Sequence, residues 1–421
     1  MRTAVTLLLV SCVFTLTAQF DTHFENKTLR IDYQHSGTNT ADFYSLDEVK
    51  ILPFWAGSKV NLIDPFEYGS YLIKAIDMAS GELIYSHGYS TLFMEWQTTA
   101  EAGMMQKSFS ETVLLPLPKD QTRVEFYSRN RSGIFEKKYE YRYDPSDYFV
   151  NPEQRFAYPV FDVQLSGDPS KKVDIVILPD GYTEKELKKF KQDCQQFAEN
   201  LFSFEPFRSN RSKFNIRGVL APSCESGNDI PADGVWKNSI LETSFYTFDS
   251  ERYCMTRANR TMHDLAANAP YDQIYILVNQ EKYGGGGIYN QYCVSVSGNL
   301  SSAKIIVHEF GHGFAGLGDE YMGDVSYNDF YPLDVEPWEP NLTTMVDFDR
   351  KWDSLVQPGV PVPTPDSGEY EHVIGVFEGG GYATRGIYRP AHDCLMNTFR
   401  VNDFCGVCQK AIQQMIDFYS K

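Results

Sequence analysis

The chain has 421 residues, 42% hydrophobic and 22% charged, which is typical of a soluble globular protein long enough for two domains. Its net charge of −18 argues against nucleic acid as a partner, because phosphate binding needs a basic surface. After the N-terminal segment no stretch has the ~20 apolar residues of a membrane-spanning helix, so we expect no transmembrane segment. The many carboxylates could also bind Ca²⁺.

The N-terminus, MRTAVTLLLVSCVFTLTAQ, has the layout of a secretory signal peptide. Arg2 precedes an apolar stretch over residues 4–16, and small residues follow up to Ala18. We expect residues 1–18 to be removed and the protein to be secreted, periplasmic or at the cell surface. The letters LVSC, which end at Cys12, resemble a bacterial lipoprotein box that would leave a lipid anchor there. The apolar run continues past Cys12, and this disfavours the anchor.

Residues 19–150 are predicted to form an N-terminal antiparallel β-sandwich domain. Runs in which Val, Ile, Tyr and Phe alternate with polar residues recur without helices between them, separated by turn residues. They lie at 28–34, 71–77, 82–89, 123–130 and 137–144. The polar, proline-containing stretch 144–154 is the expected domain boundary.

Residues 160–421 have a different pattern, in which strands alternate with helices. A buried-type strand is predicted over 171–182 and a helix over 183–202, where Thr183 and Glu186 form a capping box. Further strands are expected over 213–222 and 272–279, followed by four glycines and another strand over 284–298 and a helix over 300–318. The fold class predicted for the whole chain is therefore α+β, with an α/β second domain.

Removal of Cys12 with the signal peptide leaves seven of the eight cysteines. Cys405 and Cys408 form CGVC, a spacing that suggests redox chemistry or zinc binding in a cytosolic protein. Export favours a disulfide or buried thiols instead. His392 and Cys394 do not complete a convincing zinc motif with this pair.

The stretch IIVHEFGHGFAGLGDEY, residues 305–321, contains two of the eight histidines of the chain. On a helix His308 and His312 share one face, one turn apart, so both imidazoles can bind one Zn²⁺. Glu309 is rotated by about 100° from His308 and can reach a water on the metal rather than the metal itself. This is H-E-x-x-H chemistry, with two zinc ligands and a general base within five residues.

The third zinc ligand is expected in the turn after this helix, because Gly316 and Gly318 end the helix and allow the chain to turn back. The metzincin pattern HExxHxxGxxH has its third ligand six residues after the second histidine, where this chain has Gly318. With a shift of one residue, Gly316 takes the place of the turn glycine and Asp319 that of the ligand. Glu320 is the alternative, and His372 and His392 are more distant candidates.

Two further elements of the site follow from the metzincin analogy. Met396, in DCLMNTF, is the candidate for a methionine turn beneath the metal. Tyr388, in the glycine- and aromatic-rich stretch before it, is a candidate hydrogen-bond donor to the oxyanion, although a buried structural tyrosine is an equally good interpretation.

The motifs HEFGHGFAGLGDEY, GVFEGGGYATRGIYRP, CLMN and FCGVC together resemble the bacterial IgA peptidase-type metallopeptidase family. The resemblance covers roughly residues 165–421, and the preceding part resembles that family's β-rich N-terminal domain. It implies a metzincin-like catalytic domain, with His308 and His312 as zinc ligands, Glu309 as base and an acid of the DE pair as third ligand. Asn397 stands where arginine is usual in that family.

The glycine-rich stretch also fits such an enzyme. In metzincin-like enzymes the strand before the zinc helix borders the cleft, and its edge can hold an extended peptide by main-chain hydrogen bonds. Ile288 and Tyr289 are the predicted residues of this substrate strand. The glycines either allow close approach of the substrate or form a mobile loop.

These observations predict a secreted zinc-dependent endopeptidase that acts on a protein or glycoprotein, with Glu309 as general base and zinc held by His308, His312 and Asp319. One alternative is an exported surface- or polymer-binding protein whose zinc domain is not proteolytic. Another is a zinc hydrolase that acts on mucin-type glycopeptides.

Overall fold

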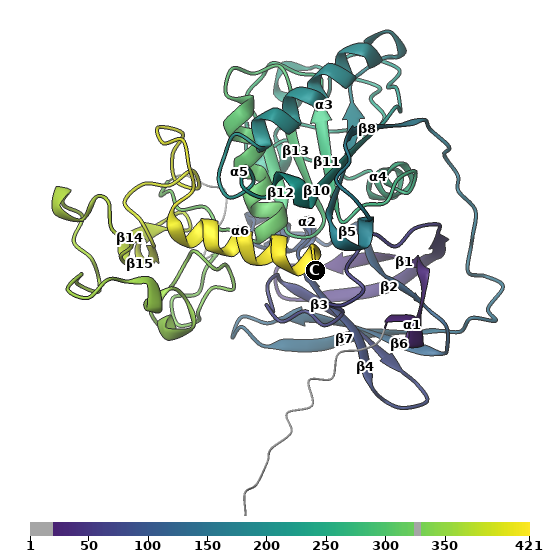
Figure 1. Cartoon of the computed structure of the whole chain (residues 1–421), viewed down its shortest axis with the longest axis horizontal. Helices are drawn as coiled ribbons and strands as arrows, with labels where there is room; N and C mark the ends of the chain where they lie inside the picture. The colour runs from purple at the N-terminus through teal and green to yellow at the C-terminus, as the bar shows by residue number, and fades with distance from the viewer. Residues whose placement is uncertain (1–19, 324–329) are drawn as a thin grey trace, which may run out of the picture.

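The computed structural model describes residues 20–323 and 330–421. The predicted signal peptide and Cys12 therefore lie outside the described residues. The chain is a mixed α+β protein in which the β-rich N-terminal part lies beneath a sheet covered by helices (Figure 1).

The N-terminal part contains two antiparallel sheets. The first has the order β2-β1-β5, with β1 (Phe24–Gly37), β2 (Asp42–Leu52) and β5 (Lys107–Pro118). The second has the order β4-β3-β6-β7, with β3 (Tyr71–Asp77), β4 (Leu83–Tyr89), β6 (Thr122–Arg129) and β7 (Phe135–Tyr143). Side chains of both sheets, such as Ile31 and Phe126, share one hydrophobic core. Two short helices accompany them, α1 (Phe20–His23) and α2 (Leu92–Gln97).

All five predicted N-terminal strands are confirmed, but β2 and β5 were not expected. In β2 buried residues occur only among the last four positions and the rest are intermediate or exposed, because the strand lies at a sheet edge. β5 includes Pro116 and Pro118, which argue against an internal strand, and the structure places β5 at the other edge of that sheet.

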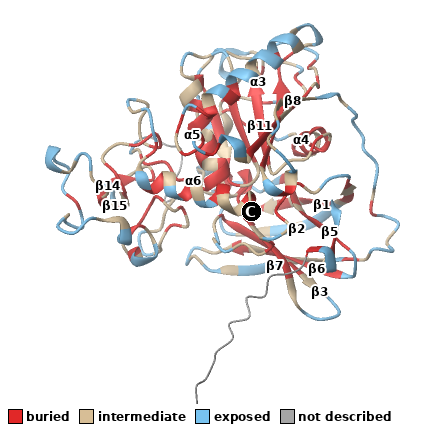
Figure 2. Ribbon diagram, in the orientation of Figure 1, coloured by how far each residue is buried: buried red, intermediate tan, exposed pale blue. Residues whose placement is uncertain are grey.

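The C-terminal part is built on a six-stranded sheet of order β12-β13-β11-β9-β10-β8. Its four inner strands are parallel, and the two edge strands run antiparallel to their neighbours. The parallel strands are β9 (Val173–Asp180), β10 (Phe214–Val219), β11 (Gln273–Val278) and β13 (Tyr292–Val296), and the edges are β8 (Val160–Gln164) and β12 (Gly285–Ile288). All residues of β9 and β11 are buried, as expected for strands covered on both faces, and Figure 2 shows β11 in red.

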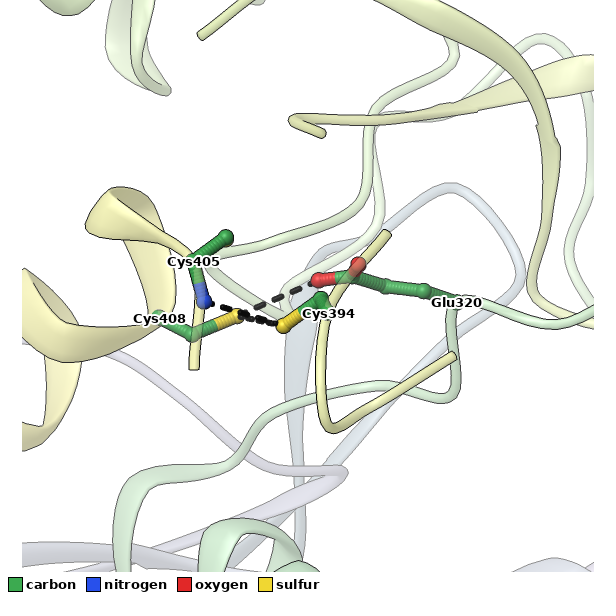
Figure 3. A group of neighbouring side chains, drawn as sticks. All are labelled: Glu320, Cys394, Cys405 and Cys408. Carbon is green, nitrogen blue, oxygen red and sulfur yellow. Dashed lines mark hydrogen bonds between the residues drawn. The ribbon is translucent and has the colours of Figure 1, made fainter. Parts of the chain in front are cut away.

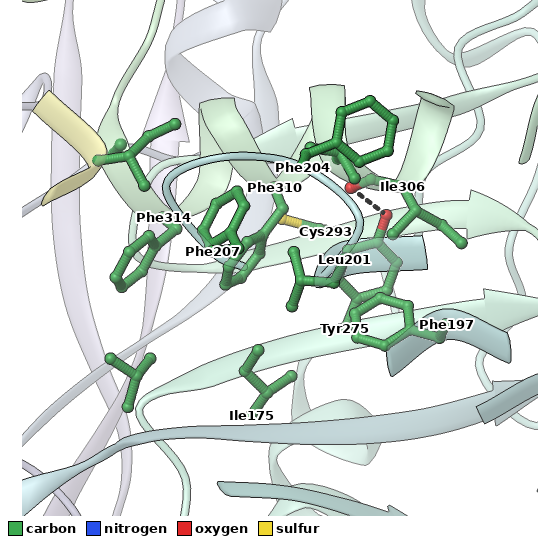
Figure 4. Packing of buried hydrophobic residues seen from close by; sticks show 14 of the residues in the cluster. Ile175, Phe197, Leu201, Phe204, Phe207, Tyr275, Cys293, Ile306, Phe310 and Phe314 are labelled. Carbon is green, nitrogen blue, oxygen red and sulfur yellow. Dashed lines mark hydrogen bonds between the residues drawn. The ribbon is translucent and has the colours of Figure 1, made fainter. Parts of the chain in front are cut away.

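Alternate residues of the central strands face two separate cores. Ile175 and Tyr275 belong to the core beneath α3 (Leu187–Leu201), α5 (Ser302–Ala315) and α6 (Gly406–Tyr419) (Figure 4). Val176 and Ile274 belong to the core beneath α4 (Asn259–Ala266). The predicted helix at 183–202 is confirmed, and the Thr183–Glu186 capping box begins it.

The C-terminal region between α5 and α6 contains a short hairpin, β14 (Phe377–Gly380) and β15 (Ala383–Arg389). α6 was not expected, although its buried residues recur at helical spacing. Within the described ranges 20–323 and 330–421, no helix has the length and apolarity needed to cross a membrane.

Candidate metal centre

Helix α5 presents His308 and His312 from consecutive turns, and their Nε2 atoms lie 3.1 Å apart. The helix ends at Gly316, which has a left-handed φ of 63°. This turn returns the chain, so that the carbonyl of Leu317 lies 2.5 Å from Nδ1 of His312. The sequence expectation of a helix stopped by glycine is confirmed.

Each imidazole is oriented by a backbone carbonyl on its other nitrogen. Nδ1 of His308 lies 3.0 Å from the carbonyl oxygen of Leu395, and Nδ1 of His312 contacts that of Leu317. A carbonyl only accepts hydrogen bonds, so in both rings the proton is on Nδ1. A cation that binds at Nε2 takes the place of any proton there, and with Nδ1 held by the carbonyls both rings direct Nε2 toward one point, which is the arrangement that a cation requires.

Asp319 brings a carboxylate oxygen to the same point. Its Oδ1 lies 3.2 Å from Nε2 of His308 and 3.3 Å from Nε2 of His312. An ion about 2 Å from three ligand atoms needs ligand separations of about 3.3 Å, so this nearly equilateral triangle fits Zn²⁺. Oδ1 is buried and makes no hydrogen bond to any described residue, whereas Oδ2 accepts one of 2.6 Å from the Tyr382 hydroxyl.

The charge state of Asp319 agrees with a ligand role. Burial raises the pKa of the carboxyl, but the nearby His312 and His308 outweigh this and hold its pKa well below the usual range. The carboxylate is therefore ionised and available to a cation.

Glu309 lies beside the two imidazoles. One of its carboxylate oxygens is within 4.8 Å of a ring nitrogen of each histidine. Burial raises the pKa of Glu309, and His308 and His312 oppose that rise. A carboxylate with a raised pKa next to a cation site is suited to accept and return a proton near neutral pH.

Met396 lies beneath the histidine helix. It is fully buried, and a Cβ built on Gly311 of α5 would come within 3.0 Å of its sulfur. Its carbonyl oxygen also accepts a hydrogen bond of 2.9 Å from the backbone N–H of Glu320. The residue therefore connects the floor of the centre to the turn that carries Asp319.

A cavity of about 340 Å³ opens over these residues, within the usual size of ligand sites. Its wall includes the glycine-rich strand β12. It also includes Ser90, Met94 and Glu95 of the N-terminal part, and several tyrosines of the C-terminal part, among them Tyr253, Tyr283, Tyr321, Tyr331 and Tyr382. Burial raises the pKa of Glu95 to about 7, so the N-terminal part contributes a titratable group to the cavity.

The predicted substrate residues lie at this cavity. Strand β12 is at the sheet edge, and both Ile288 and Tyr289 line the cavity wall. Their side chains are buried, however, so the backbone is the part of this strand that can contact a ligand. The glycines of this strand pack against helix α5 and do not form a loop. A Cβ on Gly287 would lie 2.3 Å from the carbonyl oxygen of Glu309.

Tyr388 is not brought to the centre. It is absent from the cavity wall, exchanges backbone hydrogen bonds with Thr343, and packs against the cluster around Phe348 and Trp352. The hairpin β14–β15 holds it on that side. Tyr382, which precedes β15 and was not singled out from the sequence, contacts Asp319 instead.

The other candidates for the third ligand lie elsewhere. Nε2 of His392 forms an ion pair of 2.9 Å with Asp366, and His372 is exposed. Glu320 points away from the histidines and accepts hydrogen bonds from Asn341 and Cys408. Adjacent side chains of an extended segment face opposite sides, so only one acid of the DE pair can face the histidines.

Residues 161–371 and 366–416 match the model of a family described as IgA Peptidase M64. Residues 19–140 match the model described as Peptidase M64 N-terminus.

The chain belongs to the IgA peptidase M64 family. The family resemblance seen in the sequence is therefore confirmed, and membership of M64 identifies the chain as a peptidase, which implies a protein substrate. His308, Glu309 and His312 lie in the matched region and are candidate metal-binding residues. No curated protein matches the chain.

Proposed function

We propose that this M64 protein is a zinc-dependent endopeptidase whose ion is held by His308, His312 and Asp319. The observation that carries the proposal is the triangle of two imidazole Nε2 atoms and one unpartnered carboxylate oxygen, with sides of 3.1, 3.2 and 3.3 Å. A zinc ion there would polarise the scissile carbonyl and lower the pKa of a bound water toward ~7.

Glu309 is the proposed general base. Its position beside the ligand nitrogens allows the carboxylate to take a proton from the attacking water and to return it to the leaving amine. Tyr382 is a positioning residue, because its hydroxyl fixes the ligand carboxylate of Asp319.

The edge of β12 is the proposed binding surface for an extended substrate. The N–H and C=O of Gly285 point to the outer edge, where they bond the backbone of Arg252 and Cys254. Successive residues of an antiparallel strand point their polar groups to opposite edges, so Gly287 faces the same outer edge as Gly285. Because Gly285 is already paired, a substrate backbone would add by β-strand addition at Gly287, beyond the segment that contains Arg252 and Cys254.

We also propose a two-domain architecture and export of the protein. A single core shared by both N-terminal sheets supports a β-sandwich over residues 19–150, and Met396 beneath α5 supports a metzincin-like domain over 160–421. The N-terminal composition supports export by a signal peptide at residues 1–18.

Hydrolysis of casein by the purified protein, with and without a chelator, tests the proposal. We expect internal cleavage that stops on chelation and returns on addition of Zn²⁺. Absence of hydrolysis at full zinc occupancy would favour the alternative of a surface- or polymer-binding protein. Cleavage only of mucin-type glycopeptides would favour the glycopeptide hydrolase.

A further inference from the structure

A second group of potential metal ligands lies immediately behind Asp319. Glu320, Cys394, Cys405 and Cys408 each contribute one ligand atom to a cluster whose atoms all lie within 4.8 Å of one another (Figure 3). The picture shows the Glu320 carboxylate and the Cys394 and Cys408 sulfurs directed toward one another, with Cys405 at the start of α6.

The separations fit a tetrahedral ion and not a disulfide. The sulfurs of Cys394 and Cys408 are 3.8 Å apart, whereas a disulfide bond is about 2.05 Å long. Two thiolates bound tetrahedrally to zinc at about 2.3 Å are separated by about 3.8 Å. The cluster also includes Oε1 of Glu320, which lies 3.1 Å from Sγ of Cys408.

The cluster is buried and its carboxylate is incompletely satisfied. Glu320, Cys394 and Cys408 are each 0% exposed. Oε2 of Glu320 is buried without a hydrogen-bond partner among the residues that the structure describes. A buried carboxyl oxygen without a hydrogen bond is costly, and a cation held by Glu320 and the three neighbouring cysteines would compensate it.

We propose that Glu320, Cys394, Cys405 and Cys408 form a second, structural zinc site. The C-x-x-C spacing of Cys405 and Cys408 at a helix start is a common arrangement of structural zinc ligands. Sulfur donors favour zinc over magnesium or calcium, and four protein ligands leave no open position for substrate. Binding would release the thiol protons of the three cysteines, and the proton of Glu320 where the free site holds one, to solvent, with no redox step.

This second site would position the first one. Glu320 directly follows Asp319, and its N–H bonds the carbonyl of Met396. Cys394 directly precedes Leu395, whose carbonyl orients His308. An ion that joins Glu320 to Cys394 and to α6 would therefore hold the third ligand, the methionine and one histidine in fixed relation.

Metal counting on purified full-length protein tests the proposal independently of activity. We expect two zinc ions per chain in the wild type and one in Cys408→Ser, in Glu320→Ala and in the double variant His308→Ala/His312→Ala. Cys224→Ser is the matched control, because Cys224 is an exposed free cysteine, and it should keep two.

X-ray absorption at the zinc edge identifies which ion remains. In the double variant we expect sulfur scatterers at about 2.3 Å, and in Cys408→Ser only nitrogen and oxygen scatterers. Glu320→Cys should keep two ions with an added sulfur neighbour. If the Cys408→Ser variant does not fold, the wild-type spectrum decides by the presence or absence of sulfur.

Three results would overturn this proposal: one zinc per wild-type chain, a spectrum without zinc–sulfur scattering, or a disulfide among the three cysteines in the zinc-loaded protein. None of these results would alter the prediction for the histidine site. Conversely, a protein with two ions and no peptidase activity would reject the proposed function and leave the second site intact.

Discussion

At the scale of single residues, the centre depends on how Asp319 is held. The hydroxyl of Tyr382 donates to the Asp319 oxygen that does not face the histidines, and Tyr388 lies outside the cavity. Partners that orient a metal ligand commonly contribute 10–100-fold, roughly, to metal affinity.

Tyr382→Phe should therefore weaken zinc binding by about 10–100-fold, measured by competition with a chelating dye. Tyr388→Phe is the matched control and should leave zinc affinity and kcat/KM near wild-type values. A large fall in kcat in Tyr388→Phe, with zinc affinity intact, would instead support the oxyanion role predicted for Tyr388 from sequence.

A second residue-scale prediction concerns Asp42, 12% exposed, whose Oδ2 lies 3.6 Å from Nε2 of His35. Burial raises the pKa of Asp42, but the nearby His35 imidazole and a hydrogen bond from Ser128 outweigh this and lower it to about 2. A folded-state pKa below the unfolded value contributes stability above the unfolded pKa, and that contribution is lost as the pH falls through the folded pKa.

Asp42→Asn should therefore lower the free energy of unfolding by about 2 kcal/mol at pH 7. The difference from wild type should shrink as the pH falls from about 4 toward 2. Urea denaturation across this pH range measures it, and a difference independent of pH would show that the charge of Asp42 is not the cause.

At the scale of elements, strand β12 and helix α5 are in backbone contact because three of the four residues of β12 are glycine. A Cβ on Gly287 would approach the Glu309 carbonyl oxygen to 2.3 Å and the His312 Cβ to 3.0 Å. The close approach brings the sheet edge next to the proposed base and ligands. The glycines form a packed strand and not the mobile loop that was one of the two sequence interpretations; the other, close approach of a substrate, stays a prediction.

Gly287→Ala should destabilise the protein by about 1–3 kcal/mol, because strand and helix must separate. It should also reduce kcat/KM, since β12 and Glu309 move apart. Gly368→Ala is the control, because nothing lies within 4 Å of its added Cβ. Equal denaturation midpoints for the two variants would be inconsistent with the packing described.

Some elements could be predicted from the sequence and others could not. Helix α5 and its glycine stop were predictable because one-turn spacing and a C-terminal glycine are local signals. Strand β5 was missed because its prolines conceal an edge strand. The cluster of Glu320 with Cys394 and Cys408 joins segments more than 70 residues apart, so its proximity depends on the tertiary path and not on local pattern.

At the scale of the whole molecule, a buried ionic network joins the N-terminal sheets to the C-terminal part. Arg30 of β1, which is 1% exposed, contacts Asp32 at 2.8 Å and Asp264 of α4 at 2.6 Å. Lys50 of β2 also contacts Asp264, at 3.0 Å. The N-terminal part therefore contacts the C-terminal part through this network, and it also lines the cavity wall.

Arg30→Met should lower the free energy of unfolding by about 3–5 kcal/mol, because it leaves buried carboxylates uncompensated. Arg142→Met removes an exposed ion pair with Glu140 and should change stability by about 0.5 kcal/mol at most. Chemical denaturation measures both variants. Similar small effects would mean that the buried network does not stabilise the contact between the two parts.

The proposed mechanism gives two groups of residues different roles: His308, His312 and Asp319 hold the ion, and Glu309 transfers the proton. The most direct measurement is the zinc content and the peptide-hydrolysis rate of Glu309→Gln beside wild type. We expect unchanged zinc content and a rate lower by at least about 10²-fold. Hydrolysis at the wild-type rate with the zinc retained would contradict the account.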